Sequence, residues 1–388
     1  MNADILVIGA GPTGCTLGTY LARRGARVTL VESVPRPESV VGESMLPCST
    51  EIFDELGFDM SPYLVKHGAV FCQSGQSVRF DFSEAEDPRY PYAWQVQREV
   101  FDMQWRRVAQ AAGCSIVYAE AHGFELPGKL HTSAGTLSAP LIIDAAGRSM
   151  WMSAKLGLRV GDPRLKNSAV GTRCRGVKQF SPDTPGDITI CCIPGGWIWI
   201  IPFGGGVASV GVVMSPACTL RGTAEERFKA AIAMSPDASI RLAEAERILP
   251  FRGLQDFTAT STSFYGDGFA FCGDAATFID PVFSSGVLLG LHGAKTLAAA
   301  LDGGDLPAWQ AQYREGAGVF RKVIDHWYDG AFMTVALAPK EIQKPYFRRG
   351  ITSLLAGDVW NPEHRSPRLM ADRMGQLAEG VRRLTGAA

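Results

Sequence analysis

Short apolar runs near the start of the chain predict buried strands. Residues 5–8 read Ile-Leu-Val-Ile, and residues 27–31 read Arg-Val-Thr-Leu-Val. Runs of this length that are rich in β-branched residues are typical of strands covered on both faces. Between them, residues 15–24 have the composition of a helix. The pattern therefore predicts a strand–helix–strand unit at this end of the chain.

The middle of the chain has a two-residue period instead. Successive strands separated by glycine and proline turns are expected at 169–175, 187–193, 197–203 and 207–213, with 70–82 beside them. A helix is expected to follow at 224–234. Strands joined by short turns pair as antiparallel neighbours. The sequence thus predicts a mostly antiparallel sheet next to the α/β unit.

Composition and charge exclude several classes of protein. Lys and Arg number 38 and Asp and Glu number 39, so the 388-residue chain has a formal net charge of −1. This balance shows no excess of positive charge of the kind that binds nucleic acid or an anionic membrane. No apolar run approaches the length of about 18 residues that spans a bilayer, and no signal-peptide pattern is present. We therefore expect a cytoplasmic protein with neither a nucleic acid nor a membrane as partner.

The cysteines give no sign of a disulfide framework or a metal site. Nine cysteines are scattered along the chain, and none has C-x-x-C spacing. This usage is typical of reduced thiols in the cytosol. We expect no metal.

A glycine motif joins the first predicted strand to its helix. Gly9, Gly11 and Gly14 form G-x-G-x-x-G. In this motif the first glycine allows a tight turn, the second lets the backbone approach a pyrophosphate, and the third allows close helix–strand packing. Glu32, 18 residues after Gly14, ends the next strand, where it can accept a hydrogen bond from a ribose 2′-OH. The unit predicts a dinucleotide with a free ribose, either FAD or NAD.

A second glycine cluster follows a predicted strand near residue 270. Residues 268–276 read Gly-Phe-Ala-Phe-Cys-Gly-Asp-Ala-Ala, and residues 280–287 read Asp-Pro-Val-Phe-Ser-Ser-Gly-Val. The first segment places Asp274 where a carboxylate would lie beside a flavin ribityl chain. The second opens a helix, so its backbone N–H groups would face the flavin ring or an anion.

These residues resemble the FAD-dependent aromatic hydroxylases and their flavin-dependent halogenase relatives, from residue 1 to about residue 330. The segment 41–47, Val-Gly-Glu-Ser-Met-Leu-Pro, is similar to a G-E-S-x-x-P segment of that group, and Arg98 resembles an arginine that contacts FAD. The resemblance implies FAD, which we expect to be bound non-covalently. The residues expected to bind it are Gly9, Gly11, Gly14, Glu32, Gly42, Arg98, Asp274, Ser285, Gly286 and Val287.

Two features resemble the halogenase branch in particular. Residues 197–202 read Trp-Ile-Trp-Ile-Ile-Pro, which fits the W-x-W-x-I-P pattern of flavin-dependent halogenases. Trp197 and Trp199 share one face of a strand, so they form either an apolar substrate wall or ordinary sheet core. Lys66 matches the position of the essential lysine of halogenases. Alternatively, Lys66 is an exposed residue that ends a helix. The catalytic candidates are thus Lys66, Trp197 and Trp199.

The resemblance implies an α/β fold in three parts. These are a Rossmann-like FAD-binding domain of the hydroxylase type, an inserted and mostly antiparallel substrate domain, and a short helical C-terminal region. The FAD-binding domain is expected to be discontinuous, at 1–65, 94–165 and 255–330. The substrate domain is expected at 66–93 and 166–254, and the helical C-terminal region at 331–388.

Two reactions compete as the expected function. Reduced flavin and O₂ give a flavin C4a-hydroperoxide, which can hydroxylate an electron-rich ring of indole, phenol or pyrrole type. With halide, it gives hypohalous acid, which Lys66 would hold for chlorination or bromination. Only 102 residues follow Gly286, fewer than halogenases usually carry, so we expect an FAD-dependent monooxygenase that hydroxylates its substrate. Halogenation is the alternative, and a non-oxygenating flavin reductase or accessory flavoprotein is a second one.

The expected partners follow from the same resemblance. A less enclosed site suits an aromatic substrate that is either free or borne on a carrier or partner polypeptide, such as a tryptophan in quinone-cofactor maturation. Reducing equivalents come from NAD(P)H, bound directly or supplied through a partner flavin reductase. Ala145 follows Asp144, where the hydroxylases have an Asp-Gly pair that helps to bind NADPH, and no second G-x-G-x-x-G occurs. Both features favour an external reductase.

Overall fold

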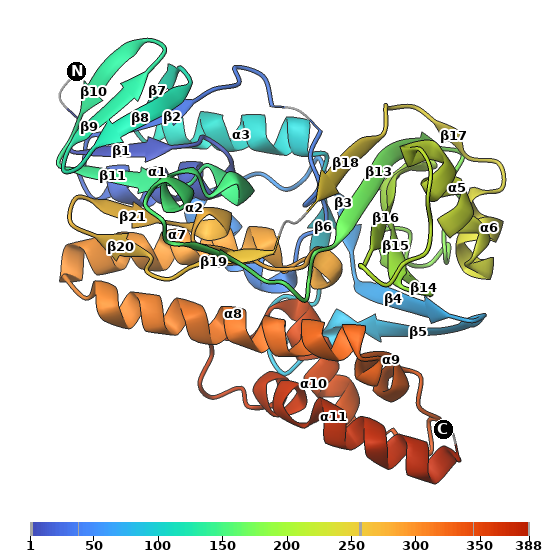
Figure 1. Cartoon of the computed structure of the whole chain (residues 1–388). Helices are drawn as coiled ribbons and strands as arrows, with labels where there is room; N and C mark the ends of the chain where they lie inside the picture. Colours follow the sequence, from blue (N-terminus) through green and yellow to red (C-terminus); the bar gives the residue numbers. More distant parts are fainter. Residues whose placement is uncertain (1–2, 38, 256–257, 344, 387–388) are drawn as a thin grey trace.

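A parallel sheet forms one end of the computed structural model, which describes residues 3–37, 39–255, 258–343 and 345–386 (Figure 1). Its strand order is β20-β21-β11-β1-β2-β7. The strands are β1 (Ile5–Ile8), β2 (Val28–Glu32), β7 (Ser115–Tyr118), β11 (Leu141–Asp144), β20 (Tyr265–Gly266) and β21 (Phe269–Phe271). All neighbours are parallel except the β20–β21 pair. The predicted Rossmann-like unit is confirmed.

Helices cover this sheet, and two of them begin at the predicted glycine turns (Figure 1). Helix α1 (Pro12–Arg23) starts directly after Gly11, and α7 (Ser285–Gly303) starts after Ser284. The other helices of this part are α2 (Thr50–Leu56), α3 (Arg98–Ala111), α4 (Trp151–Lys155) and α8 (Leu306–Tyr328). Helix α1 packs against both α3 and α7. The long helix α8 runs beside α7 and reaches toward the second sheet.

The second sheet is larger and mostly antiparallel, as predicted. Its order is β17-β13-β16-β15-β14-β4-β5, with β18 also paired to β13. The strands are β4 (Gly68–Gln73), β5 (Gln76–Asp81), β13 (Ser168–Arg175), β14 (Ile188–Ile193), β15 (Gly196–Gly204), β16 (Val207–Met214), β17 (Glu246–Arg247) and β18 (Arg252–Gln255). Only the pairing of β14 with β4 is parallel among those described.

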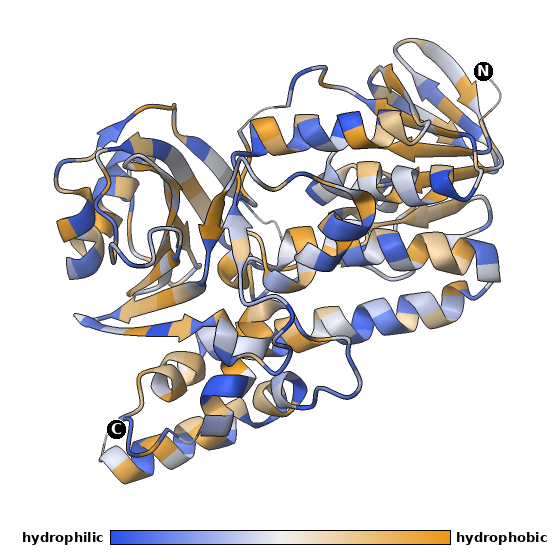
Figure 2. Cartoon of the chain, turned by 180° about the vertical axis from the view of Figure 1, so that it is seen from behind, coloured by the Kyte–Doolittle hydropathy of each residue, from blue (hydrophilic) through white to orange (hydrophobic). Residues whose placement is uncertain are grey.

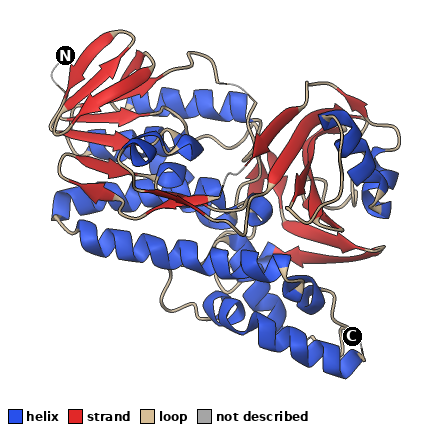
Figure 3. Ribbon diagram, viewed as in Figure 1, coloured by secondary structure: helices blue, strands red, loops and turns tan. Residues whose placement is uncertain are grey.

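The two faces of β15 enter different cores, which confirms its predicted period of two. Trp197, Trp199 and Ile201 belong to the main core of the molecule. Ile198 and Ile200 belong to a separate core. Helices α5 (Ala224–Ala233) and α6 (Pro236–Leu242) lie on that second side (Figure 3). The two tryptophans therefore face the parallel sheet and its helices.

Smaller sheets complete the described part of the chain. One pairs β3 (Leu64–Lys66) with β6 (Ala93–Gln95). A second contains β8 (Ala121–Glu125), β9 (Lys129–Thr132) and β10 (Gly135–Ser138). A third contains β12 (Arg159–Gly161), β19 (Ala259–Ser261) and β22 (Thr277–Phe278). Lys66 thus lies at the end of a strand, not of a helix.

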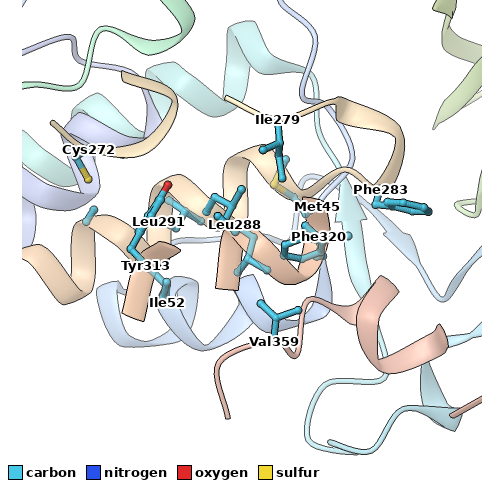
Figure 4. Close-up of a cluster of buried hydrophobic side chains, with 14 of the residues drawn as sticks. Met45, Ile52, Cys272, Ile279, Phe283, Leu288, Leu291, Tyr313, Phe320 and Val359 are labelled. Carbon is cyan, nitrogen blue, oxygen red and sulfur yellow. The ribbon is translucent and has the colours of Figure 1, made fainter. Parts of the chain in front are cut away.

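The C-terminal region is helical, as predicted. The helices are α9 (Ala331–Ala336), α10 (Pro345–Ala356) and α11 (Ser366–Thr385). Helix α11 packs against α8, α9 and α10, and α9 also packs against α8. Their apolar positions alternate with polar ones along each ribbon (Figure 2). Val359 lies below Leu288 and Phe320 in a buried cluster that also includes Met45 (Figure 4). The C-terminal region therefore shares one core with the helix that opens at residue 285. No helix within the described ranges is long and apolar enough to cross a membrane.

Candidate active site

A cavity of about 770 Å³ lies between the two sheets. Its lining includes Gly11, Glu32 and Arg98 on the side of the parallel sheet. It also includes Trp197 and Trp199 on the side of the larger sheet. The predicted cofactor residues and the predicted substrate wall therefore open into one space.

The first glycine loop has the geometry that a pyrophosphate requires. Gly9 has φ +100°, and a Cβ there would lie 2.6 Å from the Ala145 carbonyl oxygen. A Cβ at Gly14 would collide with the Gly9 carbonyl oxygen. A Cβ at Gly11, in contrast, would meet nothing within 4 Å. Gly9 and Gly14 are thus needed for the backbone packing itself, whereas Gly11 leaves space open at the N-terminus of α1, where an anion is favoured.

Glu32 is held at this loop by hydrogen bonds. Its carboxylate accepts the N–H groups of Ala10 and Val34, each at 2.9 Å. Arg106 adds an ion pair at 3.3 Å. A carboxylate has about four acceptor positions, so Glu32 can also accept a ribose hydroxyl from the cavity.

Arg98 supports the turn at Gly42. Its guanidinium binds Asp102 through two hydrogen bonds of 2.7 and 2.9 Å, and it donates to the carbonyls of Val41 and Gly42 at 3.2 and 3.3 Å. Gly42 has φ +106°, and a Cβ there would lie 2.8 Å from Arg98 Nη1. The arginine therefore fixes a backbone turn that lines the cavity.

Asp274 faces the same part of the cavity. Burial raises the pKa of its carboxyl to about 7, although Arg98 and Arg148 act in the opposite direction. A Cβ at Gly286 would lie 3.7 Å from Asp274 Oδ1. The carboxyl group is thus placed beside the start of α7, where a ligand hydroxyl could donate to it.

The start of α7 lies at the cavity, with one predicted residue outside the lining. Ser284, Gly286 and Val287 line the cavity, but Ser285 does not. Ser284 itself has a left-handed backbone conformation, with φ +58°. The Ser285 side chain is fully buried, and its hydroxyl has no hydrogen-bond partner in the part of the chain that the structure describes. The contact of Ser285 with the cofactor stays a prediction.

The two tryptophans form a fixed wall. Their ring centroids are 6.0 Å apart. The indole N–H of Trp199 donates to Ser209 Oγ at 3.1 Å, and that of Trp197 donates to the Tyr328 hydroxyl at 3.2 Å. A Cβ at Gly211 would collide with the Trp199 ring. A glycine on the neighbouring strand thus lets this indole lie flat against the sheet.

Lys66 is buried behind the cavity wall. Only 1% of the residue is exposed, and it does not belong to the cavity lining. Its Nζ donates to Ser44 Oγ at 3.0 Å and to the Met45 carbonyl at 3.1 Å. Burial lowers the pKa of Lys66 to about 7, with Asp187 acting in the opposite direction. Ser44, which accepts a hydrogen bond from this ammonium group, does line the cavity.

Sequence reasoning did not assign a role to Ser44 or to Tyr328. Ser44 was visible as the serine of Gly-Glu-Ser-Met-Leu-Pro at 42–47. No local signal marks Tyr328, because its partners Trp197 and Asp280 are 131 and 48 residues away.

Comparisons with known proteins agree with this geometry. The family model described as tryptophan halogenase matches residues 76–329, and that of pyridine nucleotide-disulphide oxidoreductases matches residues 1–62. A chlorinase of 1H-pyrrole-2-carbonyl peptidyl-carrier protein from Pseudomonas fluorescens is 29% identical, over 97% of this chain and 93% of that protein. A tryptophan 2-halogenase from Chondromyces crocatus is 32% identical over 77% of this chain, which spans 61% of that enzyme.

A solved structure covers nearly the whole fold. The crystal structure of a flavoprotein/dehydrogenase from Cytophaga hutchinsonii superposes with a TM-score of 0.90 at 29% identity, covering 98% of this chain and 99% of that one. The fold class predicted from the sequence is thus confirmed over 98% of the chain.

The expectation of hydroxylation is wrong. It rested on the short C-terminal region, yet the carrier-protein chlorinase aligns with this chain over 93% of its own length. The length of this region determines how a site is enclosed and does not determine which electrophile forms in it. The family match and the halogenase relatives support the alternative.

Proposed function

Since this chain belongs to the tryptophan halogenase family, whose model matches residues 76–329, we propose that it is a flavin-dependent halogenase acting on an electron-rich aromatic ring. One observation carries the proposal. The cavity that begins at the glycine loop ends at the tryptophan wall, and Ser44 in its lining accepts a hydrogen bond from the buried Lys66.

FAD fits the residues on the parallel-sheet side of the cavity. Gly11 leaves open space for the pyrophosphate, and Asp274 offers a carboxyl group to the ribityl hydroxyls. The residues proposed to hold it are Gly9, Gly11, Gly14, Glu32, Gly42, Arg98, Asp274, Ser285, Gly286 and Val287. When bound in its reduced form, FAD supplies the reduction of O₂ that converts halide to hypohalous acid.

The residues of this chain then position the ring and protect the oxidant. Trp197, Trp199 and Ile201 present an apolar face that excludes water from the ring and the oxidant. Lys66 keeps a proton close to the cavity, because its lowered pKa of about 7 leaves both of its protonation states accessible near neutral pH. Chlorination and bromination are both compatible with this arrangement.

We propose a pyrrole-type ring carried on a carrier protein as the substrate. The chlorinase of a carrier-bound pyrrole matches almost all of this chain and almost all of its own length. The tryptophan 2-halogenase, in contrast, has about two fifths of its length outside the match. The chlorinase is thus the relative closer in length to this chain, which favours a carrier-bound ring over free tryptophan as the substrate.

We further propose that reduced FAD comes from a partner reductase that oxidises NAD(P)H. Ala145 follows Asp144 at the end of β11, where an Asp-Gly pair helps to bind NADPH in the hydroxylases. The Asp144 carboxylate is already occupied, because it accepts the N–H groups of Ala146 and Met152 at 2.9 and 2.8 Å.

Mass spectrometry of products tests this function. The protein is supplied with FAD, a flavin reductase, NADH, O₂ and either chloride, bromide or no halide. The acceptors are pyrrole-2-carbonyl thioester on a carrier protein, free pyrrole-2-carboxylate and tryptophan. We expect a halogenated carrier-bound pyrrole that disappears without halide. A product that gains only oxygen, with or without halide, would contradict the proposal.

A further inference from the structure

Ser44 accepts a hydrogen bond from the Lys66 ammonium group and is itself a lining residue of the cavity. We propose, on the basis of the proposed halogenation, that Ser44 is a catalytic residue: its hydroxyl passes a proton from Lys66 to the oxygen of hypohalous acid while the halogen is transferred to the ring. Lys66 then acts through Ser44 and does not itself contact the oxidant.

The direction of the hydrogen bonds supports this relay. An ammonium group only donates, so the 3.0 Å contact uses a lone pair of Ser44 Oγ. The proton of Ser44 thus remains for another acceptor, and Ser44 is the member of the pair that lines the cavity. The second hydrogen bond of Lys66, to the Met45 carbonyl at 3.1 Å, keeps its Nζ on this side of the wall.

The backbone holds both residues on one small sheet. Lys66 ends β3, and β3 pairs with β6 in the register Leu64 to Gln95 and Lys66 to Ala93. Ser44 forms an antiparallel bridge to the same Gln95. A lysine that swung into the cavity would have to break two hydrogen bonds from a position that is 1% exposed. A proton transfer through Ser44 needs no such movement.

The charged groups around the pair have partners of their own. Asp187 accepts from Arg79 Nε at 2.6 Å and from the His67 N–H at 3.0 Å. Glu43, next to Ser44, pairs with Arg173 at 3.2 Å. The Lys66 side chain also lies against the Phe82 ring, 5.1 Å from its centroid. Burial thus dominates at Lys66, and its pKa of about 7 suits a general acid at neutral pH.

The step balances in atoms and electrons. A ring carbon uses a π electron pair to form the carbon–halogen bond, and the halogen–oxygen bond breaks with its pair left on oxygen. That oxygen takes the Ser44 proton and becomes water, while Ser44 takes a proton from Lys66 Nζ. The halogen is reduced and the ring carbon oxidised by two electrons. The ring proton then leaves to solvent, and Lys66 regains a proton from solvent.

Kinetics of the FAD-loaded enzyme test the relay, with chloride and the pyrrole-2-carbonyl thioester of pantetheine as the probe. We expect Ser44→Ala to lower kcat by about 100-fold, the usual contribution of a positioned acid, with KM for the thioester nearly unchanged. Ser44→Thr keeps a hydroxyl and should retain most of kcat. Ser77→Ala, at an exposed serine of β5, is the matched control and should behave as wild type.

The pH profile separates a relay from a structural role. In wild type, kcat should fall as the pH rises through about 7, because Lys66 loses its proton there. Ser44→Ala should lose this dependence, and Ser44→Thr should keep it. An S44A variant with the kcat of wild type and the same fall of kcat above pH 7 would overturn the relay. It would leave the proposed halogenation intact. A wild-type enzyme that forms no halogenated product from either pantetheine- or carrier-bound pyrrole would instead overturn the proposed function and the relay together.

A second measurement does not depend on turnover. NMR titration of carbon-labelled lysines in flavin-free protein, with Lys66 assigned by Lys66→Met, should show one lysine that titrates near pH 7. In S44A its pKa should fall further, because the charged form loses an acceptor. A pKa of Lys66 near its ordinary value of about 10.4 would overturn the coupling between Lys66 and Ser44. So would a pKa of Lys66 that is the same in S44A as in wild type.

Discussion

The indole N–H of Trp197 donates to the phenol oxygen of Tyr328 at 3.2 Å. The same phenol donates to Asp280 at 2.8 Å and accepts from Asn167 at 2.7 Å. Asp280 in turn accepts the N–H of Val282, at the start of the turn that leads to α7. One partly buried network therefore links the tryptophan wall, the turn before α7 and the end of α8.

Tyr328→Phe should weaken both stability and substrate binding. Burial raises the pKa of Asp280, and the phenol is one of its three donors. Its loss should lower the free energy of unfolding by about 1–3 kcal/mol, as measured by urea denaturation. Trp197 would also lose its anchor, so KM for the aromatic substrate should rise more than kcat falls. Tyr346→Phe, at a residue that is 56% exposed, serves as the control. Unchanged stability in Y328F would contradict the role of the network.

The sequence could predict those features that neighbouring residues determine. The glycine turn at residues 9–14 and the period of two at Trp197, Trp199 and Ile201 are local patterns, and both have the expected geometry in the structure. Each depends on backbone conformation or on alternation along one strand.

Features that depend on distant pairing could not be predicted. Lys66 was identified as a candidate, but its burial follows from the pairing of β3 with β6, whose residues come almost 30 positions later. The position of Ser44 beside the Lys66 ammonium group depends on a bridge between Ser44 and Gln95. The Tyr328 network joins residues from four separate segments. A single sequence carries no signal for such contacts, because each partner has an ordinary local environment.

Gly211→Ala should displace the Trp199 indole. The added Cβ would collide with the ring. Gly171, which pairs with Gly211 on the next strand, offers no more space, because a Cβ there would lie 2.7 Å from Trp199 Cζ2. Such overpacking should lower the free energy of unfolding by about 1–3 kcal/mol. Gly253→Ala is the control, since its Cβ would lie 3.8 Å from the nearest atom outside its chain neighbours.

A double-mutant cycle isolates that contact. Trp199→Phe removes the part of the ring that the new methyl group would meet, so G211A should cost less in the W199F background. We expect a coupling free energy of at least about 1 kcal/mol between the two positions, from urea denaturation of all four proteins. Additive effects would show that the glycine is not needed for the indole.

Asp274 should make the stability of the flavin-free protein dependent on pH. Its carboxyl has an ordinary pKa of 3.8, which burial raises to about 7. Between these values the folded chain keeps a proton that the unfolded chain releases, so this group lowers the free energy of unfolding as the pH rises through that window. Asp274→Asn cannot ionise and should gain stability relative to wild type as the pH rises from 4 to 7, by about 3–4 kcal/mol at the rate of about 1.4 kcal/mol per pKa unit.

Urea denaturation at several pH values between 4 and 8 measures this effect, with the exposed Asp267→Asn as the control. The same D274N variant should bind FAD more weakly, because an amide is a poorer acceptor for the ribityl hydroxyls than a carboxylate. A stability difference that does not change with pH would contradict the burial of an ionisable Asp274.

Gly11 and Gly14 should respond differently to the same added methyl group. At Gly14 a Cβ collides with the Gly9 carbonyl oxygen, so Gly14→Ala should lower the free energy of unfolding by about 1–3 kcal/mol even without FAD.

At Gly11 a Cβ meets nothing within 4 Å and the backbone φ is −80°, so Gly11→Ala should fold with nearly wild-type stability. Its methyl group enters the space proposed for the pyrophosphate, and the Kd for FAD, measured by flavin fluorescence, should rise at least about tenfold, equivalent to 1.4 kcal/mol. An unchanged Kd in G11A would mean that the pyrophosphate does not approach this backbone, whereas a destabilised G11A would mean that the glycine serves the fold and not the cofactor.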